Sequence, residues 1–441
     1  MENQQRKDKL KGFDTPTIWS KSSKLAMSQG CANLGQGFPD WNPPEFIFES
    51  FNHHLNNPQT NHQYTRAYGT PKLVEEISDT YSKVYNRKID TNTEILVTNG
   101  AVSALYNTIT GLVENGDEVI FIEPFYDCYL PQSIFSGAKV IGVPMIPPKV
   151  RNFKEIEITP ESLTQLKDDW HIDYDKLKSA INEKTRILIL NTPNNPTGKI
   201  LKEEELAKIA ELVKDYPNLI VVMDEVYEYM IFEGFDVLPR FANIPGMWEK
   251  TVSIMSAGKI FSMTGARIGW CIGPQHLINR LCAVHQVNSF CIYDPMQLTI
   301  ADALLKAKEP YKGFDNYYKW LRAHYTEQRN FFFNEFSKIK EKLDVDFYFP
   351  EGGYFAIAVI PEGKEISKSN IKFDGDDDIT YGDDFNYACN LAEFKKVNII
   401  PCSVFYTDEN KSYGQKFLRF AFCKSRSLIE RACNNWLNNT K

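Results

Sequence analysis

Short apolar runs alternate with amphipathic segments along the middle of the chain. Continuous apolar strands are expected at residues 94–98, 118–123, 186–191, 219–224, 252–256 and 268–273, and helices at 101–113 and 202–214. Strands that are apolar on both faces, with helices between them, are typical of a mostly parallel sheet that is covered on both sides. The pattern therefore predicts an α/β fold with a central, mostly parallel sheet flanked by helices.

The last third of the chain has a different pattern. Residues 311–342 predict one long charged helix or a pair of helices, followed by strands at 347–350, 354–360 and 417–422. We expect a large domain over residues 46–309, and a smaller α+β domain built from residues 1–45 together with residues 310–441. The acidic loop at 374–378 lacks the glutamate and the spacing of a calcium loop, so we expect a solvated loop and no metal site.

Composition narrows the class of protein. The chain has 441 residues, a net charge of -7 and a pI of about 5.7, which gives no support for a nucleic-acid or anionic-membrane partner. No apolar run approaches the roughly 18 residues that a membrane-spanning helix needs. The nine scattered cysteines contain no C-x-x-C pair and favour reduced thiols. The first ten residues resemble no targeting peptide, so we expect a cytoplasmic location, with a mitochondrial one as the alternative.

Lys259 is the first candidate for chemistry. It follows a strand that is expected to be buried and lies between Gly258 and Ile260. Burial lowers the pKa of an amine, which suits a nucleophile that forms a Schiff base with an aldehyde. The alternative is a lysine whose stem packs on apolar surface while its amine reaches water, and Lys259 on its own favours that alternative.

Two further polar motifs follow predicted strands. Asp224 ends a strand, and a buried carboxylate needs a partner, such as the protonated nitrogen of a pyridine ring. Its alternative role is the N-cap of a helix. Residues 191–198, Asn-Thr-Pro-Asn-Asn-Pro-Thr-Gly, form a stiff polar turn, whose alternative role is purely structural. Ligands of such sheets bind at the carboxyl ends of the strands, which is where Asn191, Asp224 and Ser256 are expected.

Together these motifs resemble a known family. Asn-Pro-Thr-Gly at 195–198, Asp-x-x-Tyr at 224–227 and Ser-x-Gly-Lys at 256–259, with Arg267 eight positions after the lysine, resemble the class I aminotransferases of the fold-type-I pyridoxal-phosphate family. The order and spacing hold over nearly the whole chain. Residues 33–40, 63–65, 116–119, 123–129, 351–354 and 418–420 look like the kynurenine aminotransferase branch, which includes glutamine transaminase K and cysteine-conjugate β-lyase.

The resemblance implies pyridoxal 5′-phosphate as the cofactor. Lys259 would bind it covalently and later act as the base that moves a proton, and Asp224 would pair with the pyridinium nitrogen. Asn195 and Tyr227 would bond the phenolic oxygen of the ring. Tyr126 would stack on the ring, with its neighbour Phe125 as the rival for that role.

The resemblance also implies how the phosphate and the substrate are held. The phosphate would lie at the start of the helix near residue 101; its ligands would be Gly100, Ala101, Val102, Ser256, Arg267 and, from a second subunit, Tyr64. A homodimer with shared active sites is therefore implied. Arg419 would bind the α-carboxylate of the substrate through a two-point fork, beside Asn195, and Gly37 and Trp19 would close the pocket.

The expected reaction is a ping-pong transfer of an amino group from kynurenine, or another aromatic or neutral amino acid, to a 2-oxo acid such as 2-oxoglutarate. Alternative donors are glutamine and methionine, and β-elimination from cysteine S-conjugates is an alternative reaction. The chain departs from the branch at 288–295, where Ile292 and Tyr293 stand nearest to a Phe-His pair. We expect this segment to contact the substrate from the partner subunit, or Tyr293 to have a core or interface role.

Three alternative functions are compatible with some of these motifs. A lyase or a cyclopropane-forming synthase on the same fold would keep every cofactor residue. A nucleotide-binding dehydrogenase needs G-x-G-x-x-G after a strand, whereas residues 35–37 give only G-x-G in a proline-rich turn. A non-catalytic regulator built on an aminotransferase body would carry an added DNA-binding domain, for which the chain has no basic helix.

Overall fold

The computed structural model describes residues 13, 15–57, 62–371, 373 and 381–438. The acidic loop at 374–378 lies outside these residues, so its expected role stays a prediction. Among the described residues, no cluster of His, Cys, Asp or Glu side chains is arranged to hold a metal ion.

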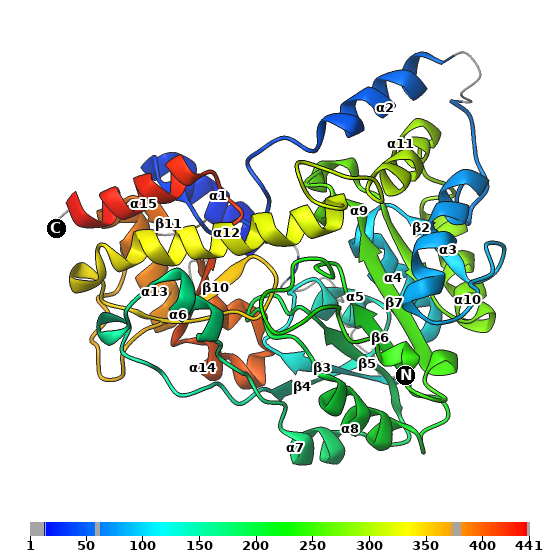
Figure 1. Cartoon of the computed structure of the whole chain (residues 1–441). Coiled ribbons are helices and arrows are strands. Elements are labelled where there is room, and N and C mark those ends of the chain that lie inside the picture. Colours follow the sequence, from blue (N-terminus) through cyan, green and yellow to red (C-terminus); the bar gives the residue numbers. More distant parts are fainter. Residues whose placement is uncertain (1–12, 14, 58–61, 372, 374–380, 439–441) are drawn as a thin grey trace.

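A seven-stranded sheet forms the centre of the larger lobe (Figure 1). Its order is β2-β8-β7-β6-β5-β3-β4, with bounds β2 Ile95–Thr98, β3 Glu118–Glu123, β4 Lys139–Pro144, β5 Thr185–Asn191, β6 Ile220–Asp224, β7 Thr251–Ser256 and β8 Gly269–Ile272. Only β8 runs antiparallel to its neighbours β2 and β7. The predicted α/β fold with a mostly parallel sheet is confirmed.

Both faces of this sheet are apolar and covered. On β5, Ile187 and Ile189 pack with helices α4, α5 and α10, whereas Leu188 and Leu190 pack with α7 and α8 on the other face. Successive side chains of a strand point to opposite faces, so a buried parallel strand is continuously apolar. The helices of this lobe are α3 Pro71–Val84, α4 Gly100–Leu112, α5 Tyr129–Phe135, α7 Tyr174–Ala180, α8 Glu203–Val213, α9 Ala257–Ile260, α10 Gln275–Asn288 and α11 Asp294–Lys306.

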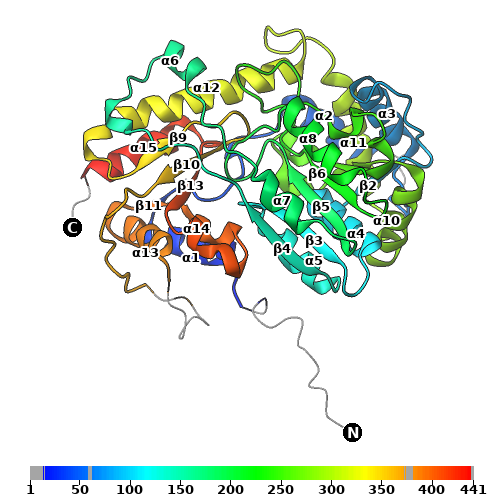
Figure 2. The ribbon, with the colours of Figure 1, turned by 90° about the horizontal axis from the view of Figure 1, so that it is seen from below.

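The C-terminal third forms a smaller lobe around an antiparallel sheet (Figure 2). The sheet order is β12-β13-β10-β9, with bounds β9 Asp346–Tyr348, β10 Phe355–Val359, β12 Ile400–Pro401 and β13 Phe417–Ala421. Its helices are α12 Tyr317–Ser337, α13 Asp383–Asn390, α14 Lys411–Gly414 and α15 Arg426–Asn438, and α6 Pro160–Gln165, from the middle of the chain, packs with this lobe. The long charged segment is thus mainly one helix. It begins at Tyr317 because Asn316 caps it, its side chain accepting a hydrogen bond from the amide of Lys319.

The N-terminal segment packs with the smaller lobe. Helix α1 (Ile18–Gln29) leads into β1 (Ala32–Asn33), which pairs in parallel with β11 (Val397–Asn398). Helix α2 (Glu45–Asn56) then projects as an arm at the top of Figure 1 and packs against α11. The exact domain boundaries proposed above stay a prediction.

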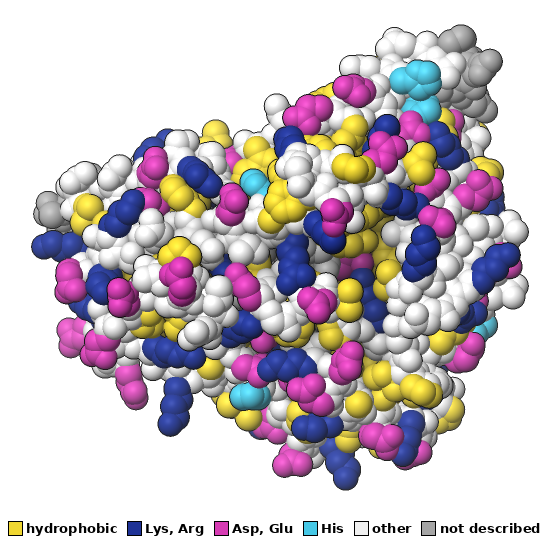
Figure 3. All heavy atoms as spheres, viewed as in Figure 1, with side chains coloured by type: hydrophobic (Ala, Val, Ile, Leu, Met, Phe, Trp, Pro, Cys, Tyr) yellow, Lys and Arg dark blue, Asp and Glu magenta, His cyan; other side chains and the backbone are white. Residues whose placement is uncertain are grey.

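Charge on the surface is mixed. Figure 3 shows acidic and basic side chains interspersed over the face seen in Figure 1. Among the residues that the structure describes, no helix is both long enough and apolar enough to cross a bilayer.

Candidate active site

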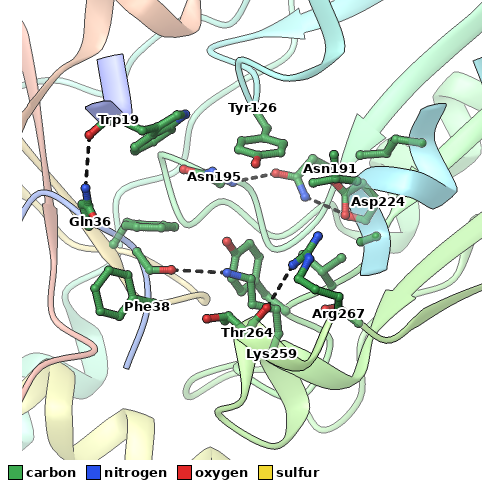
Figure 4. A pocket seen from close by; sticks show the side chains of 18 of the residues that line it. Trp19, Gln36, Phe38, Tyr126, Asn191, Asn195, Asp224, Lys259, Thr264 and Arg267 are labelled. Carbon is green, nitrogen blue, oxygen red and sulfur yellow. Dashed lines mark hydrogen bonds between the residues drawn. The ribbon is translucent and has the colours of Figure 1, made fainter. Parts of the chain in front are cut away.

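A cavity of about 380 Å³ opens at the carboxyl ends of β5, β6 and β7, where the N-terminal segment meets the large sheet (Figure 4). Asn191 and Asp224 lie side by side in the strand register, so the sheet itself places them together. The predicted residues that line the cavity are Trp19, Gly37, Ala101, Val102, Tyr126, Asn195, Asp224, Tyr227, Ser256, Lys259, Arg267 and Arg419. Chain segments from residue 19 to residue 419 thus converge on one site.

Asp224 lies at the floor of the cavity with one oxygen unused. Tyr129 donates a hydrogen bond to Oδ2, while Oδ1 is buried and has no protein partner. Burial raises the pKa of the Asp224 carboxyl to about 6, although the bond from Tyr129 opposes the shift. The amide of Asn191 donates to the backbone oxygen of Asp224 at 2.8 Å and so fixes the end of the strand. A buried oxygen without a partner can accept a hydrogen bond from a cationic N–H group of a ligand.

Lys259 lines the cavity from the end of the neighbouring strand β7. It belongs to the short helix α9, which starts directly where β7 ends, and its Nζ donates to Tyr354 Oη at 2.6 Å and to the Gly37 carbonyl at 3.3 Å. Burial lowers the pKa of the Lys259 amine to about 8, and the nearby Arg419 and Arg267 lower it as well. Near neutral pH an appreciable fraction of the amine is therefore uncharged and nucleophilic.

Arg419 is a cation held by neutral groups. It lies on β13 and is fully buried; Nη1 donates to Asn195 Oδ1 at 2.9 Å and Nη2 to the Gly35 carbonyl at 2.7 Å, while Nε has no partner. The guanidinium carbon also lies 4.1 Å from the ring centroid of Phe355 and 5.0 Å from that of Trp19. A buried guanidinium with an unused donor suits a carboxylate ligand.

The other end of the cavity is built for an anion. Helix α4 begins at Gly100, and its N-cap Asn99 makes no side-chain capping bond, so the first amides stay open. Gly100 has φ +77°, a backbone conformation that favours glycine, and a Cβ there would come within 2.6 Å of the Arg267 guanidinium. Ala101 and Ser256 line the same end. A phosphate at a helix N-terminus beside an arginine is a common arrangement.

The aromatic candidates separate clearly. Tyr126 lines the cavity, whereas Phe125 is 1% exposed and packs in the core with Phe121 and Tyr129. The structure therefore favours Tyr126 over Phe125 as the ring that faces a ligand. Tyr227 also lines the cavity, and the Lys259 amine lies 5.4 Å from its ring centroid.

Two cofactor candidates are not among the described residues that line the cavity, namely Gly100, which directly precedes the lining residue Ala101, and Tyr64. Tyr64 is 80% exposed and its ring packs edge-on against Phe290 at 5.0 Å. In the segment at 288–295, where the sequence differs from the kynurenine aminotransferase branch, Ile292 is buried. Tyr293 is about half exposed and lies within hydrogen-bond distance of His62, at 3.2 Å. A core role for Tyr293 is thus wrong, because its ring is exposed; the other two expected roles stay predictions.

Several residues with direct contacts were missed from the sequence. Tyr129 and Tyr354 both lie in motifs that resemble the family, yet nothing in the motifs showed that Tyr129 bonds Asp224 or that Tyr354 bonds Lys259. Asp127 accepts a hydrogen bond from the indole of Trp19 at 2.8 Å. Each of these contacts joins elements far apart in sequence, so only the tertiary structure reveals them.

The donor set fits pyridoxal 5′-phosphate. Such a group needs an amine for its aldehyde, an acid for its ring nitrogen, an anion site for its phosphate and an aromatic neighbour for its ring. The cavity supplies Lys259, the open oxygen of Asp224, the start of α4 with Arg267, and Tyr126. Lys259, Arg267 and Arg419 outnumber Asp224, the one acid among the described lining residues, which favours anionic ligands.

Comparison with known proteins gives the same picture. Residues 29–435 match the family described as aminotransferase class I and II. The chain is 37% identical to human kynurenine–oxoglutarate transaminase 3, over 96% of this chain and 88% of that protein. It is 36% identical to the kynurenine–oxoglutarate transaminase of Dictyostelium discoideum, over 96% and 94%. The solved structure of Escherichia coli YbdL, described as having a methionine aminotransferase function, is similar with a TM-score of 0.80 at 28% identity, covering 98% of both chains.

The chain therefore belongs to the aminotransferase class I and II family. The curated relatives named above are kynurenine–oxoglutarate transaminases.

Proposed function

We propose that this protein is a pyridoxal-5′-phosphate-dependent transaminase that moves the amino group of kynurenine, or of another aromatic or neutral amino acid, to a 2-oxo acid such as 2-oxoglutarate. One observation carries the proposal: a buried amine of lowered pKa, Lys259, and a buried carboxylate with an unused oxygen, Asp224, line the same cavity. The bound cofactor would supply an electron sink that stabilises negative charge at the substrate Cα.

The protein's own groups divide the work. Arg419, with the side chain of Asn195 beside it, would bind the substrate α-carboxylate and fix the Cα over the ring. Lys259 would bind the cofactor aldehyde, and once released it would take the proton from Cα. Asp224 would keep the ring nitrogen protonated, which is why its second oxygen must stay free of protein partners. Tyr227 and Asn195 would bond the phenolic oxygen.

The cavity walls support an aromatic or large neutral donor. Trp19, Phe38 and Phe355 line the substrate end, and no third arginine besides Arg267 and Arg419 lies among the described lining residues. A distal carboxylate, as in aspartate, would thus meet no dedicated cation. The names of the curated relatives make kynurenine the first donor to test.

The test is a donor and acceptor screen with the cofactor-loaded enzyme. Kynurenine, glutamine, methionine, phenylalanine and a cysteine S-conjugate are each paired with 2-oxoglutarate, and both products are measured. Parallel lines in double-reciprocal plots with kynurenine would support the proposed ping-pong reaction. Pyruvate and ammonia from the S-conjugate would identify β-elimination. No amino transfer from any donor, despite a bound cofactor, would refute the proposed function.

A homodimer with shared active sites is part of the proposal. Large hydrophobic or aromatic side chains are exposed on α2, around Tyr64 and at the end of α10 into the following loop, namely Phe48, Leu55, Tyr64, Val287, Phe290 and Tyr293. A second cavity, lined by Tyr293, also reaches Arg267, so this surface borders the phosphate end of the site. Sedimentation velocity should give a dimer. A cofactor-loaded, active monomer would remove Tyr64 from the site.

We also propose a cytoplasmic location, which the reduced state of the thiols supports. All nine cysteines are free, and seven of them are buried. Fluorescence microscopy of a C-terminally tagged protein would test this, with mitochondrial import as the contrary outcome.

A further inference from the structure

The phenol of Tyr354 lies between the catalytic amine and the N-terminal segment. Tyr354 is fully buried and directly precedes β10, and its Oη is 2.6 Å from Lys259 Nζ and 2.6 Å from the Gly37 carbonyl oxygen. The same carbonyl is 3.3 Å from Lys259 Nζ. Tyr354, Lys259 and Gly37 thus form a closed triangle of polar atoms.

The direction of each hydrogen bond follows from the chemistry of the groups. A carbonyl can only accept, so both the phenol and the amine donate to Gly37. Burial raises the pKa of Tyr354 well above its ordinary value, so the phenol stays neutral and keeps its proton. Its proton goes to Gly37, which leaves the phenol oxygen to accept a hydrogen from Lys259.

This arrangement uses both hydrogens of a neutral amine. One N–H of Lys259 is directed to Tyr354 and the other to Gly37. A neutral amine has two hydrogens and one lone pair, so the lone pair must point away from both acceptors. Lys259 and Gly37 both line the cavity, whereas Tyr354 is not among the described lining residues; the lone pair that neither acceptor uses is therefore available to a ligand in the cavity.

We propose that Tyr354 is a positioning residue that receives the ε-amine of Lys259 whenever this amine is not bonded to the cofactor, and that it directs the lone pair toward the substrate Cα. This inference rests on the proposed function and deepens it. Packing alone explains why the ring of Tyr354 is buried, since it contacts Tyr227, Tyr325 and Phe355. Packing does not explain the hydroxyl group, because a phenylalanine at this position would make the same ring contacts without it.

Other side chains also influence the pKa of the Lys259 amine, and a substitution of Tyr354 leaves them in place. The titratable or charged side chains that face Lys259, besides Tyr354, are Tyr227, Cys423, Arg419, Arg267 and Asp224. Only Tyr354 and Gly37 among the described residues are within hydrogen-bond distance of its Nζ. Removing the phenol oxygen should therefore lower the pKa of the Lys259 amine.

The first experiment uses the cofactor-free protein and the variant Tyr354→Phe. Trace labelling with acetic anhydride across a pH series, read by mass spectrometry on the peptide that contains Lys259, gives the apparent pKa of this amine. Loss of an acceptor for the ammonium form should lower that pKa by about 1. Tyr317→Phe is the matched control, because the equally buried Tyr317 hydroxyl donates to the carbonyl of Ile260 at 2.9 Å, next to Lys259. The control should titrate as the wild type does.

The second experiment uses the cofactor-loaded enzyme. Tyr354→Phe should lower kcat about tenfold and leave KM nearly unchanged, although its amine is more often neutral at pH 7. A more reactive amine that catalyses more slowly is the signature of lost positioning. An unchanged titration curve, or an unchanged kcat, would overturn the inference. If the wild type itself transfers no amino group, the proposed function fails, but the titration still tests the contact.

Discussion

Two neighbouring residues at the end of β6 enter very different environments. Asp224 turns into the cavity, where Tyr129 is its neutral partner and one oxygen is left open. Glu225 is as deeply buried but points into a cluster with Arg240 and Glu228, in which Arg240 Nη1 lies 2.6 Å from Glu225 and Nη2 contacts Glu228. Tyr81 adds a hydrogen bond to Glu228.

The difference is in how the charges are compensated. In the Arg240 cluster each carboxylate touches the guanidinium, although Glu225 Oε1 and Arg240 Nε lack partners of their own. In the cavity, the hydrogen-bond partners of Asp224, Lys259 and Arg419 are neutral. Buried charges without opposite charges are costly, and they persist where a ligand supplies the missing charge. The first cluster is therefore structural, and the second is preorganised for ligands.

The largest expected effect is on catalysis. Lys259→Ala should abolish amino transfer, by roughly 10⁴-fold or more, because it removes both the covalent anchor and the base. Reduction with borohydride should then trap no adduct between protein and cofactor. Lys199→Met is the control, since this buried lysine is paired with Asp169 at 2.7 Å and Glu205 at 3.0 Å. It should retain the adduct. Transfer at the parent rate by Lys259→Ala would identify another residue as the anchor.

Breaking the paired cluster should act on stability. Arg240→Met leaves Glu225 and Glu228 buried without their cation, and we expect a loss of about 3–5 kcal/mol in the free energy of unfolding. The loss should be smaller at pH 5 than at pH 8, because the uncompensated carboxylates can then take up protons. Urea unfolding at pH 5 and at pH 8 measures the free energy of unfolding under both conditions. Arg426→Met, which removes an exposed pair with Glu327, should leave the midpoint unchanged. A wild-type midpoint for Arg240→Met would remove the distinction between the two clusters.

Asp224→Asn should increase the free energy of unfolding of the cofactor-free protein, whereas Arg240→Met decreases it. Burial raises the pKa of Asp224 from 3.8 to about 6, so the native state binds more protons than the unfolded state between these values. The cost of burying the carboxylate therefore grows as pH rises and is complete above about pH 6. Asparagine removes this cost, which should stabilise the cofactor-free protein by about 2–3 kcal/mol at pH 7 and by nothing below pH 3.8.

With the cofactor bound, the same change should be harmful. Asparagine cannot supply the negative charge that pairs with a protonated ring nitrogen, so the affinity for pyridoxal 5′-phosphate should fall. Thermal melts with and without the cofactor measure both effects on one sample. Destabilisation of the cofactor-free protein would show that Asp224 is compensated by the protein after all.

Arg419→Lys tests recognition of the substrate. Lysine keeps the charge but loses the planar fork, so we expect KM for the amino acid to rise about 30-fold, equivalent to about 2 kcal/mol. The dissociation constant of the cofactor, measured by fluorescence titration, should not change. An unchanged KM would exclude Arg419 from the carboxylate site.

Trp19→Phe should have the smallest effect. It keeps an aromatic wall but removes the indole N–H that donates to Asp127 at 2.8 Å, and we expect about a fivefold rise in KM for aromatic donors. Trp41→Phe is the control, because its indole donates to Ser262 at 3.2 Å and Trp41 is not among the residues that line the cavity. Equal effects of the two changes on KM would mean that the bond to Asp127 has no specific role.

Much of this fold could be predicted because its signals are local. The strands β3 and β6 are continuous apolar runs, and Pro124 follows directly after β3. Helix α12 was less predictable: the apolar and charged pattern extends from residue 311, but the helix begins at Tyr317, since Tyr311 pairs with Phe314 in a preceding turn. Such a turn depends on contacts that the helical periodicity does not report.

By itself, the sequence determined the sheet, the family and the residue types that carry the chemistry, because parallel strands are continuously apolar and their carboxyl ends must meet at one edge. Only the tertiary structure decided how those residues are compensated. Tyr354 reaches Lys259 across 95 positions, and Tyr129 reaches Asp224 across the same number. Whether Asp224 or Glu225 is left with a neutral partner depends on which side chains fold against the end of β6, and no local pattern contains that information.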